Sequence, residues 1–126
     1  PEQAADAYEE ILRQQYGASE LTAERPLFDL VLLGLGDDGH TASLLPGQPV
    51  LKERTRWVAP VPSGREEPRI TLTYPAIESS AAIAFLVTGA GKAPALRQAR
   101  AGALPAGGIV PQGGVFWFVD SLAAGS

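Results

Sequence analysis

The sequence predicts an α/β fold in which helices flank a parallel sheet, and two patterns lead to this prediction. Residues 27–35 and 81–88 are almost continuously apolar apart from Asp29, as is typical of strands covered on both faces. A segment with helical spacing precedes the first run and another follows the second, so strands and helices alternate. The 126 residues suffice for one hydrophobic core, since domains cluster at roughly 100 to 150 residues.

The N-terminal segment predicts an amphipathic helix over residues 2–16. Apolar side chains recur there at helical spacing, acidic residues stand near the start, and Gly17 follows, where a left-handed C-terminal cap is expected. Because the chain opens on a helix already under way and contains no methionine, we expect a fragment of a longer protein.

The remaining chain predicts short elements joined by loops. Segment 41–45 can form only about one helical turn before Pro46 and Gly47 stop it. The run at 115–120 predicts a strand, and we expect its aromatic residues, Phe116, Trp117 and Phe118, in the core. We further expect strands at 57–61 and 69–73, helices at 74–78 and about 92–101, and loops at 63–68 and 105–114.

Composition excludes several classes of protein. The chain has 45% hydrophobic and 19% charged residues, and no apolar run approaches the ~20 residues of a membrane helix. We therefore expect a soluble, cytoplasmic protein without a signal peptide. With no cysteine and one histidine, disulfides and cysteine- or histidine-rich metal sites are excluded, so no metal is expected. The net charge of −4 and ten scattered cations argue against nucleic acid as a partner.

The loop GLGDDGHTASLLPG at 34–47 contains the glycine spacing of a dinucleotide-binding turn. Such a turn also needs a helix aimed at the pyrophosphate and an acidic residue about 20 positions on. Here Asp37 and Asp38 would repel a pyrophosphate, Pro46 ends any helix, and residues 56–62 contain no acid. The dinucleotide interpretation is therefore weak.

A second interpretation places a general base in this loop. Ligands of open α/β sheets bind at the carboxyl ends of the strands, where Asp38 and His40 would lie together. A carboxylate can orient a histidine that activates water, and the loop's glycines, Gly36 and Gly39 among them, would leave N–H groups free for an oxyanion. The alternative remains that His40 caps a short helix or satisfies a buried carbonyl, with Asp37 as the helix N-cap.

The residues of this loop resemble a known family. FDLVLLGLGDDGHTASLLPG at 28–47 is similar to the signature of 6-phosphogluconolactonases, and three further segments match in the same order: RITLTYPAI, FLVTGAGKAPALR and FWFVD. The resemblance implies a Rossmann-like sheet shared with glucosamine-6-phosphate deaminases and ribose-5-phosphate isomerases. It also implies hydrolysis of 6-phospho-D-glucono-1,5-lactone to 6-phosphogluconate in the oxidative pentose phosphate pathway, without metal or cofactor.

The resemblance also implies roles for individual residues. His40 corresponds to the family's catalytic histidine and Asp38 to its supporting carboxylate, while Arg69 and Lys92 fall where phosphate-contacting cations are expected. A sugar phosphate carries nearly two negative charges, and Lys92 follows a glycine-rich turn suited to anions. With Gly36 and Gly39, these residues make up the predicted catalytic and substrate-binding set.

Two alternatives remain open from the sequence. The related deaminases and isomerases carry a carboxylate five residues after the histidine, where this chain has Leu45, so isomerisation lacks a partner. Family members are also about twice as long, and their first half carries a phosphate-gripping turn. We therefore expect residues 1–126 to be the C-terminal portion of one such domain, inactive alone, and a non-catalytic sugar-phosphate-binding fragment is the third interpretation. The sequence leaves the oligomeric state open.

Overall fold

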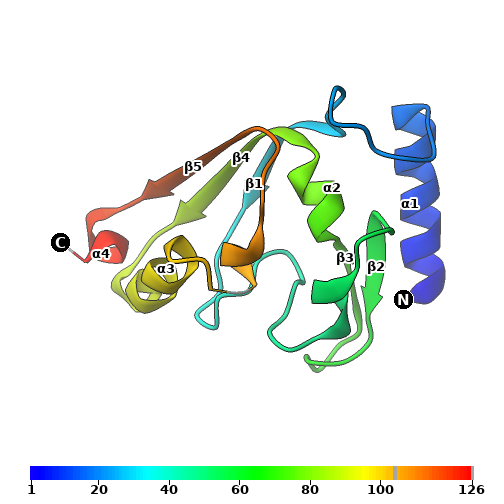
Figure 1. The fold of residues 1–126 in the computed structure, drawn as a ribbon. Helices are drawn as coiled ribbons and strands as arrows, with labels where there is room; N and C mark the ends of the chain where they lie inside the picture. The colour runs from blue at the N-terminus through cyan, green and yellow to red at the C-terminus, as the bar shows by residue number, and fades with distance from the viewer. Residues whose placement is uncertain (104, 126) are drawn as a thin grey trace.

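The computed structural model describes residues 1–103 and 105–125, and it contains two small sheets with helices around them (Figure 1). One sheet has three parallel strands in the order β1-β4-β5, and the other is the antiparallel pair β2-β3. The strands are β1 (Phe28–Leu33), β2 (Val58–Val61), β3 (Arg69–Leu72), β4 (Ser80–Val87) and β5 (Gly114–Val119). The predicted parallel α/β architecture is thus confirmed, with the β2-β3 hairpin added to it.

The helices predicted at 2–16, 74–78 and about 92–101 are confirmed, whereas the short helix at 121–124 was not predicted. Helix α1 ends at Gly17, whose φ of 83° is the left-handed cap conformation expected there. Thr73 caps α2, because its hydroxyl accepts from the Ala76 amide at 3.4 Å. The α-helices are α1 (Glu2–Tyr16), α2 (Tyr74–Glu78), α3 (Ala93–Arg100) and α4 (Ser121–Ala124), and the 3-10 turns are η1 (Pro49–Lys52), η2 (Ala90–Lys92) and η3 (Ala106–Gly108).

Helix α1 packs mainly against the β2-β3 hairpin (Figure 1). Its Glu9 carboxylate accepts hydrogen bonds from the backbone N–H groups of Trp57 at 2.6 Å and Val58 at 3.0 Å. The Tyr16 ring meets the buried Trp57 indole edge to face, with centroids 5.6 Å apart. These contacts make a small second core beside the main one.

The prediction of a helical turn at 41–45 is wrong. Thr41 and Leu44 form an isolated bridge, and the Thr41 hydroxyl donates to the Gly34 carbonyl at 2.7 Å, while Ala42 has a φ of 50°. A positive φ cannot continue a right-handed helix, so the chain makes a tight turn instead.

The predictions for the apolar strands were partly wrong. β1 was expected to be covered on both faces, but it lies at the edge of the sheet, and Leu30 and Leu32 are exposed. The run 115–120 was expected to place all its aromatic residues in the core, yet Phe116 and Phe118 are exposed and only Trp117 packs inward, stacked on Phe85. The reason is alternation: successive residues of a strand point to opposite faces, and the described residues cover one face only.

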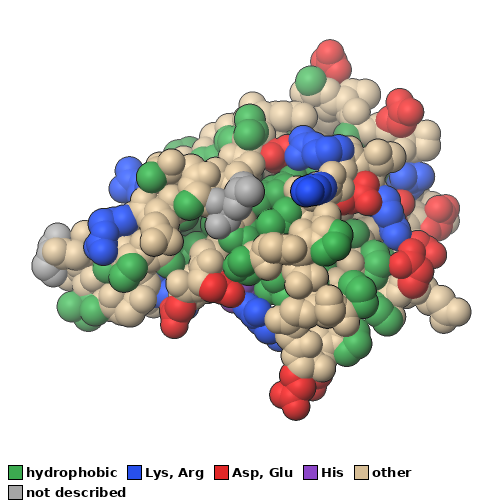
Figure 2. Space-filling model, turned by 60° about the horizontal axis from the view of Figure 1, so that its bottom comes forward, with side chains coloured by type: hydrophobic (Ala, Val, Ile, Leu, Met, Phe, Trp, Pro, Cys, Tyr) green, Lys and Arg blue, Asp and Glu red, His purple; other side chains and the backbone are tan. Residues whose placement is uncertain are grey.

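The surface is acidic over α1. Figure 2 shows Asp and Glu side chains gathered on the right of that view, over the helix that carries Glu2, Asp6 and Glu10, whereas Lys and Arg side chains lie in several separate places. No helix among the described residues is long and apolar enough to cross a bilayer. An anionic ligand would therefore depend on a few local cations rather than on a broad basic surface.

Candidate functional site

The loop after β1 is fixed to two other parts of the structure, β3 and η3. The loop begins at the carboxyl end of β1. Its Ser43 amide donates to the Thr71 hydroxyl of β3 at 3.1 Å. The Gly39 carbonyl accepts from the Ala106 amide of η3 at 2.9 Å. The Thr41–Gly34 hydrogen bond closes the base of the loop. These contacts hold the predicted reactive residues at the edge of the sheet where ligands of α/β folds bind.

Asp38 and His40 form a close pair in this loop. His40 Nδ1 lies 2.6 Å from Asp38 Oδ1, and the backbone N–H of His40 donates to the same oxygen at 3.0 Å. An ionised carboxylate only accepts, so Nδ1 carries the proton and the lone pair lies on Nε2. The side chains of His40 and Asp38 are 27% and 39% exposed, so a small ligand can approach the pair. The pair has the arrangement of a histidine base oriented by a carboxylate.

The carboxylate of Asp38 is held in its ionised form. Partial burial alone would raise the pKa of Asp38, but hydrogen bonds from the His40 side chain and backbone and from Arg65 outweigh that effect. Together they hold the pKa of this carboxyl well below its usual range. Asp38 is therefore ionised at neutral pH and acts as an acceptor.

Gly36 leaves the space that the His40 ring occupies. A Cβ atom built at Gly36 would lie 2.1 Å from His40 Nδ1 and 2.9 Å from Asp38 Oδ1. Any side chain at this position would displace the ring, so a glycine is required for a steric reason. Gly39 has a φ of 86°, which permits the turn between Asp38 and His40.

The expectation that the amides of Gly36 and Gly39 stand free for an oxyanion needs correction. The Gly36 N–H donates to the His40 carbonyl at 2.8 Å, and the Gly39 N–H donates to the Gly36 carbonyl at 2.9 Å. Both donors are used inside the loop, because the tight turn that joins Asp38 to His40 needs them. The two glycines therefore shape the site through their small size and conformation.

Arg65 is a site residue that the sequence interpretation missed. Its Nη2 donates to Asp38 Oδ2 at 2.8 Å and lies 3.4 Å from His40 Nδ1, while its Nη1 donates to the Gly64 carbonyl at 2.9 Å. It belongs to segment 63–68, which was interpreted as a polar loop. The only signal in the sequence is a single arginine between the two short strands β2 and β3. Arg65 reaches Asp38 only when these two strands pair.

Lys92 lies beside the candidate base His40, while its role as a phosphate contact stays a prediction. A pocket of about 340 Å³ is lined by both residues together with Gly36, Thr41 and other loop residues. Lys92 Nζ is 2.9 Å from Asp37 Oδ1, and the Asp37 side chain is 80% exposed. Such an exposed pair contributes about 0–1 kcal/mol, so the ammonium group can exchange Asp37 for an anionic ligand.

Arg69 and Leu45 lie outside this pocket. Arg69 is the first residue of β3, is exposed, and is not among the residues that line the pocket. Its role as a phosphate contact stays a prediction. Leu45 is 1% exposed and packs in the main core, so no acidic group stands at that position of the loop. Within the part of the chain that the structure describes, no three His, Asp or Glu side chains come together as metal ligands.

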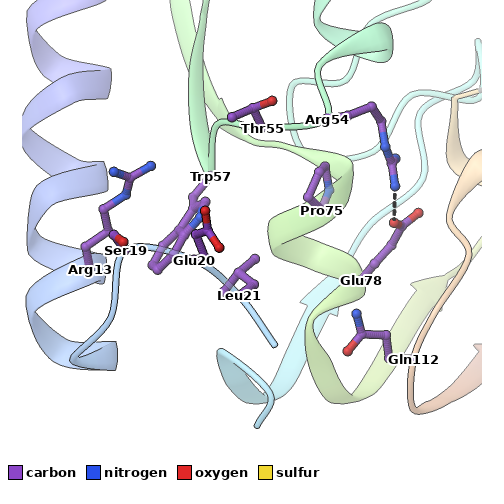
Figure 3. A pocket seen from close by; sticks show the side chains of 10 residues that line it. All are labelled: Arg13, Ser19, Glu20, Leu21, Arg54, Thr55, Trp57, Pro75, Glu78 and Gln112. Atoms are coloured by element: carbon purple, nitrogen blue, oxygen red, sulfur yellow. Dashed lines mark hydrogen bonds and ion pairs between the residues drawn. The ribbon is translucent and has the colours of Figure 1, made fainter. Parts of the chain in front are cut away.

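A larger hollow of about 570 Å³ lies at the opposite end of the strands (Figure 3). Its lining includes residues that precede strands, such as Leu21 before β1 and Gln112 before β5, so it is at their amino ends. Its two guanidinium groups, from Arg13 and Arg54, are matched by carboxylates, among them Glu78, which pairs with Arg54 at 3.1 Å. The hollow has no excess of positive charge with which to select a sugar phosphate.

Comparison with known proteins identifies the family. The family model described as "Glucosamine-6-phosphate isomerases/6-phosphogluconolactonase" matches residues 1–117. A 6-phosphogluconolactonase of Rattus norvegicus is 41% identical over 98% of this chain and 49% of its own length. The Homo sapiens relative of the same name is 39% identical over 98% of this chain and 49% of its own. A probable chloroplastic 6-phosphogluconolactonase of Oryza sativa is 44% identical over 97% of this chain and 41% of its own length.

Solved structures give the same result. The 6-phosphogluconolactonase from Trypanosoma cruzi superposes with a TM-score of 0.81 and 30% identity, over 99% of this chain and 52% of that one. A monomeric glucosamine-6-phosphate deaminase superposes less well, with a TM-score of 0.63 and 26% identity. The match covers 96% of this chain and 53% of the deaminase. The chain thus spans about half the length of the relatives it matches. It belongs to the glucosamine-6-phosphate isomerase/6-phosphogluconolactonase family, and its parallel sheet and flanking helices are those of that fold.

Proposed function

We propose that this chain carries the catalytic residues of a 6-phosphogluconolactonase, which hydrolyses 6-phospho-D-glucono-1,5-lactone to 6-phosphogluconate in the oxidative pentose phosphate pathway. The observation that carries the proposal is the 2.6 Å contact of His40 Nδ1 with Asp38 Oδ1 at a pocket that Lys92 also lines. The names of the relatives from Rattus norvegicus and Homo sapiens support it.

In the proposed reaction, His40 serves first as a base and then as an acid. Its Nε2 takes a proton from water while the water oxygen bonds to the lactone carbonyl carbon, C1. The bond from C1 to the ring oxygen then breaks, and the ring oxygen receives the proton from Nε2 to become a hydroxyl group. The new carboxylic acid releases a proton to solvent. Asp38 keeps its charge throughout and stabilises the imidazolium that forms between the two steps.

The phosphate group is assigned to cations near the pocket. A phosphate monoester carries nearly two negative charges, and this acidic chain must meet them locally. Lys92 is the primary candidate because it lines the pocket with His40, and Arg69 is retained as a second contact from the family resemblance. Gly36 is retained as a substrate-binding residue because it lines the pocket, and Gly39 is retained from the sequence prediction. The cytoplasmic location stays a prediction, since the relatives include chloroplastic proteins.

Deamination or isomerisation of a sugar phosphate is the alternative. The buried Leu45 supports hydrolysis over this alternative, because it stands where the related deaminases and isomerases are expected to carry a carboxylate. Hydrolysis of a lactone needs a base that activates water and no second carboxylate, and the Asp38–His40 pair can provide that base.

The proposal is tested in a chimera that joins this chain to the part of the Rattus norvegicus relative that it does not match. Progress curves with fresh 6-phosphogluconolactone should exceed the spontaneous rate, and glucosamine 6-phosphate should not be turned over. His40→Asn should lower kcat by roughly 10²- to 10⁴-fold, the usual contribution of a general base. Lys92→Ala should mainly raise KM. Gln98→Ala, on the exposed side of α3, is the control and should match the parent chimera.

Three other outcomes of this experiment would each contradict one part of the proposal. A His40→Asn chimera as fast as its parent would mean that His40 is not the base. Turnover of glucosamine 6-phosphate would favour the deaminase alternative. A folded chimera that binds 6-phosphogluconate and hydrolyses nothing would favour a non-catalytic sugar-phosphate-binding role.

A further inference from the structure

The loop at 34–47 carries two neighbouring carboxylates, and the proposed reaction uses only one of them. Asp38 accepts hydrogen bonds from His40 and Arg65 and is fixed from two sides. The Asp37 side chain is 80% exposed, and its only ion pair among the described residues is with Lys92, where Oδ1 lies 2.9 Å from Nζ. Asp37 is therefore held by one exposed contact and can leave it by rotation of its side chain.

This ion pair joins the ends of two neighbouring strands. β1 and β4 are adjacent and parallel (Figure 1), and Asp37 follows β1, while Lys92 is the last residue of η2, which follows β4. Lys92 lines the pocket together with His40, whereas Asp37 is not among the lining residues. The carboxylate of Asp37 thus contacts the ammonium group without itself lining the pocket.

The cations of this region are each paired with a carboxylate of the same loop. Lys92 pairs with Asp37, and Arg65 pairs with Asp38 at 2.8 Å. A phosphate group that approaches Lys92 must compete with Asp37 for the ammonium group. One charge at about 4 Å in water changes a binding constant roughly fivefold at low ionic strength, so this competition is large enough to measure.

The charge of Asp37 acts more strongly on the product of the proposed reaction than on its substrate. The lactone is charged at its phosphate only, whereas 6-phosphogluconate also carries the carboxylate that hydrolysis creates. Repulsion grows with the charge of the ligand, so a carboxylate beside the pocket weakens binding of the product more than binding of the lactone. Such a carboxylate favours release of the product.

We propose that Asp37 is an internal competitor for Lys92, and that it limits how tightly the pocket retains 6-phosphogluconate. The inference rests on the proposed function, through the assignment of the phosphate group to Lys92. Asp37 takes no part in the chemistry: its carboxylate gives up the ammonium group when the ligand binds and contacts it again when the ligand leaves. Because the Asp37 side chain is exposed, this exchange requires only side-chain rotation.

Binding of 6-phosphogluconate to the chain itself tests this inference, and it needs no turnover. His40 is the only histidine of the sequence and lines the pocket, so its ring signals in NMR spectra report binding in every variant. Dissociation constants are measured for the parent chain, Asp37→Asn, Lys92→Gln and the double variant. Asp29→Asn is the matched control, because it removes the same charge from an exposed residue of β1 that does not line the pocket.

We expect Asp37→Asn to bind 6-phosphogluconate roughly fivefold more tightly than the parent at low ionic strength, and Asp29→Asn to match the parent. Lys92→Gln should bind it more weakly. Once Lys92 is replaced, Asp37→Asn should have little further effect, because no ammonium group is left to compete for. In about 1 M NaCl, where the Debye length is about 3 Å, most of the difference between Asp37→Asn and the parent should disappear.

The lysine side chains provide a second measurement. The chain contains two lysines, Lys52 and Lys92, so ¹³C labelling of lysine gives two sets of side-chain signals. In the parent chain without ligand, NaCl should shift the Lys92 signals as it screens the ion pair, and Asp37→Asn should reduce this response to that of the exposed Lys52. An equal response of Lys92 to salt in the parent and in Asp37→Asn would overturn the inference.

Three results of the binding experiment would also overturn it. Equal dissociation constants for the parent and Asp37→Asn would show that the carboxylate does not compete. An equal gain from Asp37→Asn with and without Lys92 would show general repulsion rather than competition for the ammonium group. Unchanged His40 signals in every variant would show that this pocket does not take the ligand.

Failure of the proposed function gives a different result. A chimera that hydrolyses no lactone, although Asp37→Asn tightens binding through Lys92, would contradict the lactonase proposal and leave this inference standing. Binding that is unchanged in Lys92→Gln would remove the assignment of the phosphate to Lys92, and the inference with it.

Discussion

Arg65 and His40 contact different oxygens of the same carboxylate: Arg65 Nη2 is 2.8 Å from Asp38 Oδ2, and His40 Nδ1 is 2.6 Å from Asp38 Oδ1. Asp38 is thus held from two sides, by its own loop and by the loop between β2 and β3. The arginine adds to the effect of His40 in lowering the pKa of the carboxyl, and the charged carboxylate orients the histidine. Residue 65 therefore contributes to the geometry of the candidate base without having to touch a substrate.

Arg65→Ala should raise the pKa of Asp38 toward its usual value without restoring it fully, because the hydrogen bonds from His40 remain. The ¹³C chemical shift of the Asp38 carboxyl group, followed through acid titration, measures this directly. Arg69→Ala is the control and should leave the titration unchanged. Since Arg65 and Asp38 are 33% and 39% exposed, the change in free energy of unfolding should stay within about 1 kcal/mol. An unchanged Asp38 titration in Arg65→Ala would contradict this role.

Gly36→Ala should separate Asp38 from His40, because the new methyl group would lie 2.1 Å from His40 Nδ1. The ring must rotate away, and its hydrogen bond to Asp38 is lost. In the active chimera we expect kcat to fall by at least tenfold, toward the level of a His40 variant. Gly91→Ala is the matched control, since a Cβ atom there meets nothing within 4 Å. Parent-like kcat in Gly36→Ala would show that the pair is not needed in this geometry.

Glu78→Ala should destabilise the fold, whereas Glu78→Gln should do so less. The buried carboxylate accepts from the Val110 amide at 2.8 Å and from Arg54 at 3.1 Å. Alanine leaves the amide without this acceptor, at a cost of about 1–3 kcal/mol, while glutamine keeps a carbonyl oxygen in reach. Urea unfolding of the two variants measures the difference. Equal loss of stability in both would mean that charge, and not the acceptor, is what Glu78 provides.

Stability should decline in alkaline solution through Tyr74. Burial, with a smaller contribution from the charge of Glu78, raises the pKa of Tyr74 to about 12, compared with 10.0 in an unfolded chain. Below pH 10 the phenol is protonated in both states; above it, the unfolded state loses its proton first, so stability falls between pH 10 and about 12. Tyr74→Phe should be less stable at neutral pH, because the hydrogen bond to the Pro105 carbonyl is lost, but should show a flatter dependence on alkaline pH. An identical alkaline decline in both proteins would exclude Tyr74 as the cause.

The sequence predicted most helices and strands because their signals are local. Gly17 could be identified as a helix cap from its neighbours, and the alternation of apolar runs with helical segments predicted the parallel sheet. Where a prediction failed, at 41–45, the tight turn depends on the Thr41 hydroxyl and the backbone of Gly34, a contact that no pattern of helix formers contains.

What the sequence by itself determined is that Asp38 and His40 stand two positions apart across a glycine in a short loop, which allows the two side chains to meet in one tight turn. Only the tertiary structure brought Arg65 to Asp38 and Lys92 to the same pocket, because those contacts depend on how β2 pairs with β3 and where β4 ends. It also decided which faces of the strands are covered. Alternation assigns Phe116 and Phe118 to one face and Trp117 to the other, but burial depends on which other elements pack there, and Phe116 and Phe118 are exposed.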